Sequence, residues 1–260
     1  MVPSSRIMSE FGWLAPAVLL ATIPLQGCNA ANSTKPEELT SRSANMATSG
    51  STHEDHLVAI DVLLLPDQTM FDSASAWNGR LREQMPEGFA LDASHSPHIT
   101  LLQQYVSEKD LRAVVEAVKT VAASTDLKSM KLTANGLYHI PSGKIGLQGI
   151  TIRPSSDILA LQAKIIGTLA PYRRSGGDQT AFVPDPNGAP FDPFLFKYVD
   201  TFVEIGSGAK YNPHVTTGTA PIAWVEAREA EPFKSFDFGV DRITVYQLGN
   251  FGTAARPLAE

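Results

Sequence analysis

The stretch SPHIT at Ser96–Thr100 returns, slightly altered, as NPHVT at Asn212–Thr216. Each copy places a histidine two residues before a threonine, with one β-branched apolar residue between them. Side chains alternate between the two faces of a strand, so His and Thr would share one face while Ile99 or Val215 points into the core. From average residue usage, Pro-His-(Ile/Val)-Thr should occur about once in 10⁵ positions, so two copies in 260 residues favour a functional pair over chance.

The two copies together predict one site that takes a phosphate diester. His98 and His214 are 116 residues apart (214 − 98), which suits a site shared by two halves of a fold. An imidazole with an ordinary pKa of about 6.5 is a base when neutral and an acid when protonated. Thr100 and Thr216 can donate hydroxyl hydrogen bonds to non-bridging phosphate oxygens. The alternative for either histidine alone is a partly buried, hydrogen-bonded imidazole, and the matched pair favours the site.

The remaining sequence predicts an α+β chain. Apolar spacing indicates strands over residues 56–65, 97–106, 130–140, 144–152 and 241–248, and helices over 71–85, 107–123 and 155–169. Ser107 and Ser155 are the expected N-caps of the last two helices. Residues 173–193, rich in proline and glycine, are expected to form a loop. Residues 194–205 and 211–219 are predicted to form a β-hairpin around the Gly-Ser-Gly at 206–208.

These motifs resemble those of the 2H phosphoesterase superfamily, which includes the LigT-like RNA 2′,3′-cyclic phosphodiesterases, also named 2′-5′ RNA ligases. The first copy with Leu101 matches the family pattern fully, whereas Thr217 stands where the family has an apolar residue. The resemblance covers about residues 56–249. It implies a bilobal, pseudo-symmetric fold of two antiparallel sheets with flanking helices and an active site in the cleft between them.

The resemblance also implies a chemistry. His98 and His214 would form an acid/base pair that hydrolyses 2′,3′-cyclic phosphodiesters to 2′-phosphates, and the two threonines would bind the phosphate. Neither a cofactor nor a metal is expected, and the sequence does not decide which histidine is the acid. His95 and His98 have His-x-x-His spacing, but Pro97 disfavours a regular helix and no carboxylate or cysteine cluster completes a metal site.

Four further residues are weaker substrate-binding candidates. Tyr105 and Tyr211 lie in or beside the motif strands, where an aromatic ring either stacks on a base or fills the core. Lys210 and Arg173 are candidate phosphate contacts, with plain solvation as the alternative.

The N-terminus predicts export and a lipid anchor. An apolar run ends in Leu25-Gln26-Gly27-Cys28, which resembles a bacterial lipobox, and Cys28 is the only cysteine. We therefore expect a lipoprotein signal peptide over 1–27, a flexible tether over 28–55, and a folded domain over 56–260. An ordinary cleaved signal peptide is the alternative. The predicted location is the bacterial cell envelope, with the protein lipid-anchored and facing the periplasm or the cell surface.

The net charge of −6 argues against a protein that grips long nucleic acid, because phosphate neutralisation supplies most of that affinity. A small cyclic nucleotide or an RNA terminus is the expected partner of a monomeric protein. No Gly-x-Ser-x-Gly, Walker-type or Cys-x-x-Cys motif competes with this interpretation. The rival hypothesis is a non-catalytic lipoprotein that binds an anionic, phosphate-containing ligand in the same cleft.

Overall fold

The computed structural model describes residues 55–92 and 95–258. The predicted signal peptide, Cys28 and the tether as far as residue 54 lie outside them. The strands within the described residues are β1 Leu57–Pro66, β2 Ile99–Ser107, β3 Lys131–Ser142, β4 Ile145–Ile152, β5 His214–Pro221, β6 Phe236–Leu248 and β7 Ala254–Pro257. The helices are α1 Gln68–Gln84, α2 Leu111–Ala123, α3 Ser156–Leu169, α4 Pro193–Ile205 and α5 Ile222–Glu229.

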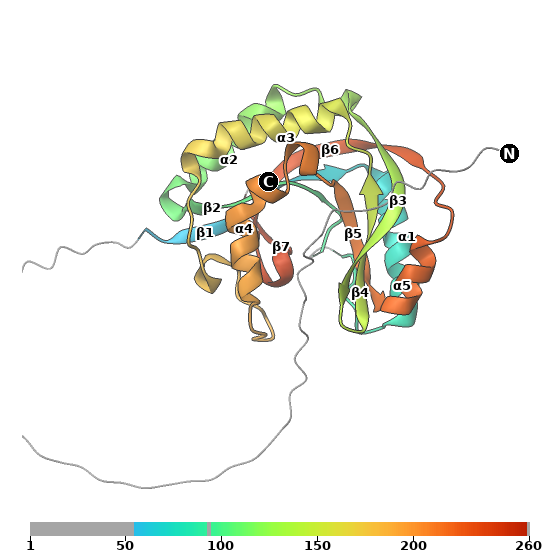
Figure 1. Cartoon of the computed structure of the whole chain (residues 1–260). Coiled ribbons are helices and arrows are strands. Elements are labelled where there is room, and N and C mark those ends of the chain that lie inside the picture. The colour runs from blue at the N-terminus through green and yellow to red at the C-terminus, as the bar shows by residue number, and fades with distance from the viewer. Residues whose placement is uncertain (1–54, 93–94, 259–260) are drawn as a thin grey trace, which may run out of the picture. The chain divides into compact units, whose positions relative to one another are not determined.

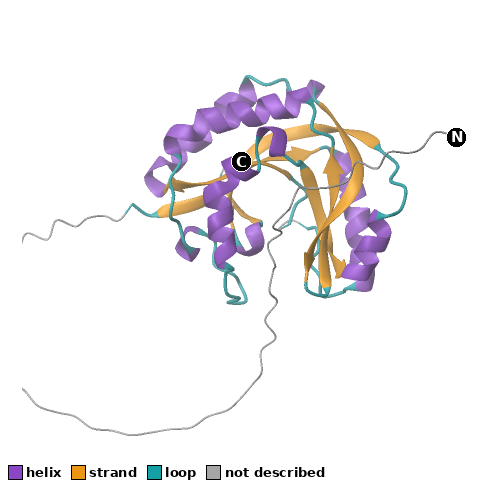
Figure 2. Ribbon diagram, in the orientation of Figure 1, coloured by secondary structure: helices purple, strands orange, loops and turns teal. Residues whose placement is uncertain are grey.

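The strands form an antiparallel sheet in the order β2-β1-β6-β3-β4-β5, with β7 added beside β6 (Figure 2). The long strand β6 serves both halves: residues 236–239 pair with β3, and residues 240–247 pair with β1. The predicted α+β class with an antiparallel sheet and flanking helices is confirmed. The two sheets of that prediction are continuous with each other, because one strand of 13 residues is long enough to pair in both.

The helices pack against the two halves of this sheet. Helices α2 and α3 lie side by side and contact β6 and β2, whereas α1 and α5 pack near β3, β4 and β5 (Figure 1). The Ser155 side chain accepts a hydrogen bond from the Ile158 N–H and caps α3, as predicted. Ser107 makes no such cap; a short 3₁₀ turn precedes α2, and the Ser107 hydroxyl donates to the Asp55 carboxylate instead.

The predicted hairpin over residues 194–219 is wrong in its first half, because residues 193–205 form α4. The Asp192 carboxylate accepts from the Phe194 N–H at 2.8 Å, and Pro193 occupies the first turn. Val199 and Phe202 are the buried residues of this helix, three positions apart. The run FLFKYVDTFVEI is apolar enough to form either a strand or a helix. The Asp192-Pro193 sequence before it favours the start of a helix.

Two short elements were not predicted. Helix α5 follows directly after β5, and β7 pairs with the end of β6 through residues 254–257. No helix among the residues that the structure describes has the length and apolar character needed to cross a bilayer.

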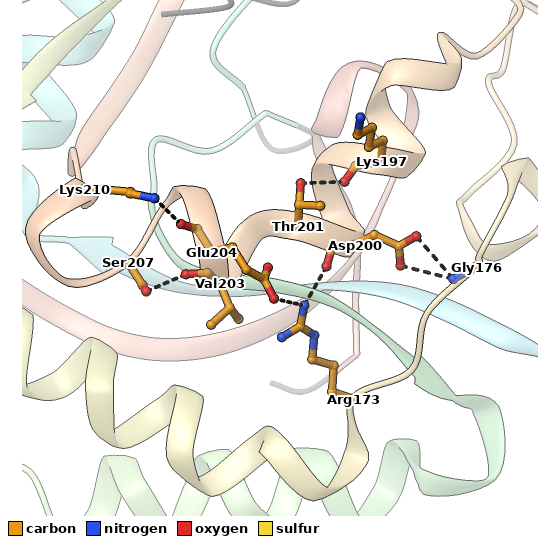
Figure 3. A network of polar contacts seen from close by, with 9 residues as sticks. All are labelled: Arg173, Gly176, Lys197, Asp200, Thr201, Val203, Glu204, Ser207 and Lys210. Atoms are coloured by element: carbon orange, nitrogen blue, oxygen red, sulfur yellow. Dashed lines mark hydrogen bonds and ion pairs between the residues drawn. The ribbon is translucent and has the colours of Figure 1, made fainter. Parts of the chain in front are cut away.

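The loop over residues 173–193 is fastened to the sheet and to α4. The Arg174 N–H donates to the Tyr105 carbonyl of β2 at 2.8 Å, and the Val183 N–H donates to the Leu248 carbonyl of β6 at 2.8 Å. The Gly176 N–H donates to the Asp200 carboxylate of α4 at 3.1 Å (Figure 3). The last of these bonds ties the loop to α4, which itself contacts β2.

Candidate active site

The two motifs begin the two strands at the ends of the main sheet path. His98 directly precedes β2, and His214 is the first residue of β5. Ile99 and Val215 are completely buried, whereas the histidine and threonine of each copy are partly exposed. The predicted alternation of faces is therefore confirmed in both copies. Thr217, which replaces the family's apolar residue, is buried and donates its hydroxyl proton to the Gln148 carbonyl at 3.1 Å.

Tyr211 ties the two motif strands together. Its hydroxyl donates to the Thr100 carbonyl of β2 at 2.8 Å, from a position three residues before β5. The charge of His98 also acts on the pKa of His214, which places the two imidazoles in one electrostatic environment. The structure thus brings into contact the two strands that carry the four residues predicted to be catalytic.

Both histidines are held in the same way. The Nδ1 of His98 lies 2.8 Å from the Ser96 carbonyl oxygen, and the Nδ1 of His214 lies 2.8 Å from the Asn212 carbonyl oxygen. A carbonyl oxygen only accepts hydrogen bonds, so Nδ1 carries the proton in each ring. Each Nε2 is therefore the nitrogen that can take or give a proton. The spacing of two residues places a backbone carbonyl behind each ring in the same way, although the residue that supplies it differs between the copies.

Tyr138 and Gly149 build the wall behind His214. Tyr138, Gly149 and Thr216 are register partners on the adjacent strands β3, β4 and β5. The Tyr138 ring lies across the glycine, and its centroid is 4.8 Å from that of the His214 ring. A Cβ on Gly149 would meet the Tyr138 ring at 2.3 Å and the Val215 carbonyl oxygen at 2.7 Å. Only glycine gives this ring room to reach the second motif.

Partial burial changes the pKa values of two groups in the second half of the site. It lowers the pKa of His214 below its ordinary value of 6.5; the bond to the Asn212 carbonyl opposes this, and the charge of His98 adds to it. Burial also raises the pKa of Tyr138, and the neighbouring Thr216 hydroxyl opposes that change. Near neutral pH, His214 is therefore a neutral imidazole beside a neutral phenol.

The first half of the site is backed by a buried carboxyl group. Asp61 of β1 has no exposed surface, and its Oδ2 accepts from the Thr100 hydroxyl at 2.9 Å and from the Gln103 amide at 3.0 Å. Burial raises the pKa of Asp61, and the charge of His98 and these two hydrogen bonds oppose the rise. Sequence analysis did not single out Asp61, although it is the one charged residue in the apolar run LVAIDVLLLP of β1.

Helix α4 adds Tyr198 to the site. Burial and, to a smaller extent, the charge of Asp61 raise the pKa of Tyr198 to about 12. Tyr198 in turn adds to the raised pKa of Tyr138, so this phenol acts on groups of both halves. No pattern in the sequence pointed to Tyr198, because the segment that carries it was predicted to be a strand.

The weaker predicted binders make contacts of their own. Tyr105 has no exposed surface, packs edge-on against Phe182 and donates to the Phe196 carbonyl at 3.2 Å, which places it in the core. Arg173 donates to the Asp200 carbonyl at 2.7 Å and pairs with Glu204 at 2.8 Å (Figure 3). Lys210 donates to the Glu204 carbonyl at 2.9 Å and closes the end of α4 (Figure 3). Phosphate binding by the two cations stays a prediction.

The described residues hold no cluster of three or more His, Cys, Asp or Glu side chains with the geometry of a metal site. The side chains at the two motifs are instead suited to proton transfer and to hydrogen bonding of an anion. They comprise two imidazoles with available Nε2 atoms, two threonine hydroxyls, a buried carboxyl and buried phenols.

Comparison with known proteins identifies the family. No curated protein matches the sequence. Among solved structures, TT0787 of Thermus thermophilus is similar with a TM-score of 0.43 and 13% identity, covering 75% of this chain and 92% of that chain. Usb1 of Kluyveromyces marxianus has a TM-score of 0.34 and 9% identity, covering 78% and 98%. The profile of one family matches residues 71–250, more than half of the chain. The chain belongs to the 2′-5′ RNA ligase superfamily.

Proposed function

We propose that this protein hydrolyses 2′,3′-cyclic phosphodiesters of small nucleotides or short RNA ends by means of two histidines and without a metal. Membership of the superfamily indicates an activity on phosphodiesters. The observation that carries the finer proposal is the matched pair of imidazoles, each fixed through Nδ1 by a carbonyl two residues earlier. The pair leaves two Nε2 atoms for proton transfer, one for each side of a phosphorus atom.

His214 is the general base in this proposal. Its lowered pKa keeps it neutral near pH 7, so its Nε2 can accept a proton from water. The resulting hydroxide oxygen bonds to phosphorus while the bond from phosphorus to one ribose oxygen breaks. The family resemblance favours loss of the 3′ oxygen, which gives a 2′-phosphate.

His98 is the general acid. It acts on the buried Asp61, because the charge of His98 opposes the rise in the pKa of that carboxyl group. Its Nε2 gives a proton to the leaving ribose oxygen, so that one proton enters the histidine pair from water and one leaves it. Thr100 and Thr216 donate hydrogen bonds to the non-bridging oxygens, where negative charge grows in the transition state. Exchange with solvent then restores the two protonation states.

The proposed substrates are small. The chain carries a net charge of −6, and the two candidate phosphate-binding cations, Arg173 and Lys210, are bonded to α4. Long polymers would gain little from backbone neutralisation on such a surface. A cyclic nucleotide or an RNA end needs only the phosphate site and one flanking base.

The test is ³¹P NMR of the full chain with 2′,3′-cyclic AMP in the presence of EDTA. Conversion to a single phosphomonoester supports the proposal, and its regiochemistry identifies the oxygen that leaves. His98→Ala and His214→Ala should each abolish conversion. His56→Ala is the matched control, because this histidine is 55% exposed and lies outside the motifs. Turnover that persists in both motif variants would contradict the assignment. Binding without turnover would support the rival hypothesis of a phosphate-binding lipoprotein.

We also propose that Cys28 carries a lipid anchor that holds the protein in the bacterial cell envelope. The Leu-Gln-Gly-Cys sequence supports this assignment. Cells grown with labelled palmitate should label the wild-type protein, and Cys28→Ala should remove both the label and the membrane association. Labelling that survives the substitution would refute the anchor at this position.

A further inference from the structure

Asp61 is a buried carboxyl group for which the proposed hydrolysis needs no direct role. It has no exposed surface, and it is the one aspartate that is fully buried among the residues the structure describes. One of its oxygens, Oδ2, accepts both hydrogen bonds, from Thr100 and Gln103. The other, Oδ1, is buried without a partner. A fully ionised carboxylate in these surroundings would be poorly solvated.

Titratable and polar groups approach Asp61 from each neighbouring element. His98 and the β2 residues lie on one side, and Tyr198 reaches it from α4. The charge of Asp61 also acts on Tyr211, ahead of β5, and Tyr246 of β6 is its register partner. Of these groups only His98 can carry a positive charge, and that charge opposes the rise in the pKa of Asp61. The protonation of Asp61 is therefore linked to His98 and to any anion that binds nearby.

The single hydroxyl proton of Thr100 cannot be donated to Asp61 and to a bound phosphate at the same time. The threonine hydroxyl has one proton, which it donates to Asp61 while that carboxylate is ionised. A bound phosphate would then face only the lone pairs of this oxygen, because the single donor already points away from it. The role of Thr100 in the proposed function therefore requires that Asp61 stop accepting this proton.

We propose that Asp61 is a positioning residue that takes up a proton when a phosphodiester anion binds, and then donates it to Thr100. The Oδ2–H of the neutral acid donates to the Thr100 oxygen, and the Thr100 hydroxyl turns its own proton to a non-bridging phosphate oxygen. The observed separation of 2.9 Å fits a hydrogen bond in either direction. This inference rests on the proposed function, since it assumes a phosphate at the motif threonines.

The second half of the site supports the same arrangement. There Tyr138 is a neutral phenol whose pKa Thr216 influences, and its buried hydroxyl makes no hydrogen bond to the residues that the structure describes. We expect this hydroxyl to donate to Thr216 when the anion binds, without any change of protonation. Each motif threonine would then have one donor behind it and its own proton free for the phosphate. An anion remains at this half of the site throughout, because the bound phosphate brings its own negative charge while Asp61 is neutralised by the proton it takes up.

The inference predicts a specific pH dependence of binding. If the phosphodiester binds only when Asp61 is neutral, the apparent affinity falls tenfold for each pH unit above the pKa of Asp61 in the free protein. The ligand itself does not titrate in this range when it is a diester. Asp61→Asn should remove this fall, because the asparagine amide donates to Thr100 at every pH.

The experiment is calorimetry of 2′,3′-cyclic AMP binding between pH 5 and 9, in paired buffers of different ionisation enthalpy. The His214→Ala variant is used throughout, so that the ligand is not hydrolysed. We expect Asp61→Asn in this background to take up fewer protons than its parent, by as much as one, and to bind at least as tightly at pH 8. Because His98 and Asp61 act on each other through their charges, the comparison is repeated with His98→Gln added to both proteins, so that no proton taken up by His98 enters the difference.

A second measurement keeps the native Asp61, so it still tests the proposal if the Asp61→Asn variant fails to fold. Infrared difference spectra of protein labelled with ¹³C-aspartate should gain the band of a protonated aspartic acid when the ligand binds. No binding by either protein would refute the proposed function. Equal proton uptake by the parent and Asp61→Asn on binding, or no acid band, would refute the role of Asp61 and leave the proposed function standing. Weaker binding by Asp61→Asn at every pH would show that the ionised carboxylate is the working form.

Discussion

Gly149→Ala tests whether the contact between Tyr138 and the second motif matters. Gly149 of β4 lies between Tyr138 of β3 and Thr216 of β5 in the register of these adjacent strands. A single methyl group added there points at the aromatic ring and adds no charge or polarity. The change therefore isolates the space that the ring requires.

The structure sets the size of the effect. The added Cβ would lie 2.3 Å from the Tyr138 ring, whereas ordinary contact begins at 3.4 Å, so the ring must move by 1.1 Å (3.4 − 2.3). The Val215 carbonyl at 2.7 Å blocks relaxation toward β5. Overpacking of this kind costs about 1–3 kcal/mol of unfolding free energy. A displacement of about 1 Å in a catalytic site lowers the rate about 10²-fold.

The assay combines urea unfolding, kcat/KM with 2′,3′-cyclic AMP, and the proton NMR signal of the His214 ring. The chemical shift of this signal depends on the nearby Tyr138 ring, so we expect it to change in Gly149→Ala even if the natural substrate is a different diester. Gly167→Ala is the matched control, because this exposed glycine of α3 has nothing within 4 Å of an added Cβ. The control should gain up to about 1 kcal/mol, since alanine is the better helix former.

A second substitution examines the cause. Tyr138→Ala removes the ring that the new methyl group would strike, so Gly149→Ala should destabilise the Tyr138→Ala protein less than it destabilises the wild type. Unchanged stability, unchanged activity and an unchanged His214 signal in Gly149→Ala would together refute the role given to this glycine. Strict additivity of the two substitutions would show that the destabilisation has another source.

Three other outcomes follow from the electrostatics and hydrogen bonds of the site. The acidic limb of the kcat/KM profile should lie below pH 6.5, because burial lowers the pKa of the base His214; a limb above that value contradicts the assignment. Asp61→Asn should stabilise the fold more at pH 8 than at pH 4 in urea unfolding. Burial raises the native pKa of Asp61 above its ordinary value of 3.8, so the unfolding free energy of the wild type falls as the pH rises from 3.8 through the native pKa. An equal difference in stability between variant and wild type at pH 4 and pH 8 would count against this prediction. Tyr211→Phe should cost about 1 kcal/mol in urea unfolding and lower kcat/KM, because it deletes the bond to the Thr100 carbonyl; a protein unchanged in both would show that this tie is dispensable.

Local patterns in the sequence predicted much of the fold. The alternation of Ile99 and Val215 with the motif residues follows from the period of a strand, and the Ser155 cap follows from the hydrogen-bonding needs of a helix start. Both depend on neighbours within a few residues. The order of strands in the sheet and the sharing of β6 depend on pairing over long distances, which periodicity does not encode.

The failures have equally specific causes. Residues 194–205 are apolar on most sides, so that helical and extended periods both fit, and the Asp192-Pro193 start signal was not used. Asp61 was visible as a lone charge in an apolar strand, but only the structure shows that Thr100 bonds to it. Tyr138 and Gly149 are ordinary strand residues in the sequence. Their importance comes from the register that sets one across from the other.

The two motif copies cannot by themselves divide the work of acid and base. Each imidazole is bonded through Nδ1 to a carbonyl at the same spacing and the same distance, so the local geometry treats them alike. The difference arises from what the sheet places behind each copy. Burial lowers the pKa of His214, whose ring lies against Tyr138, whereas the charge of His98 acts on the buried carboxyl group of Asp61. The proposed division into acid and base rests on this difference, which the strands β1 and β3 supply through Asp61 and Tyr138.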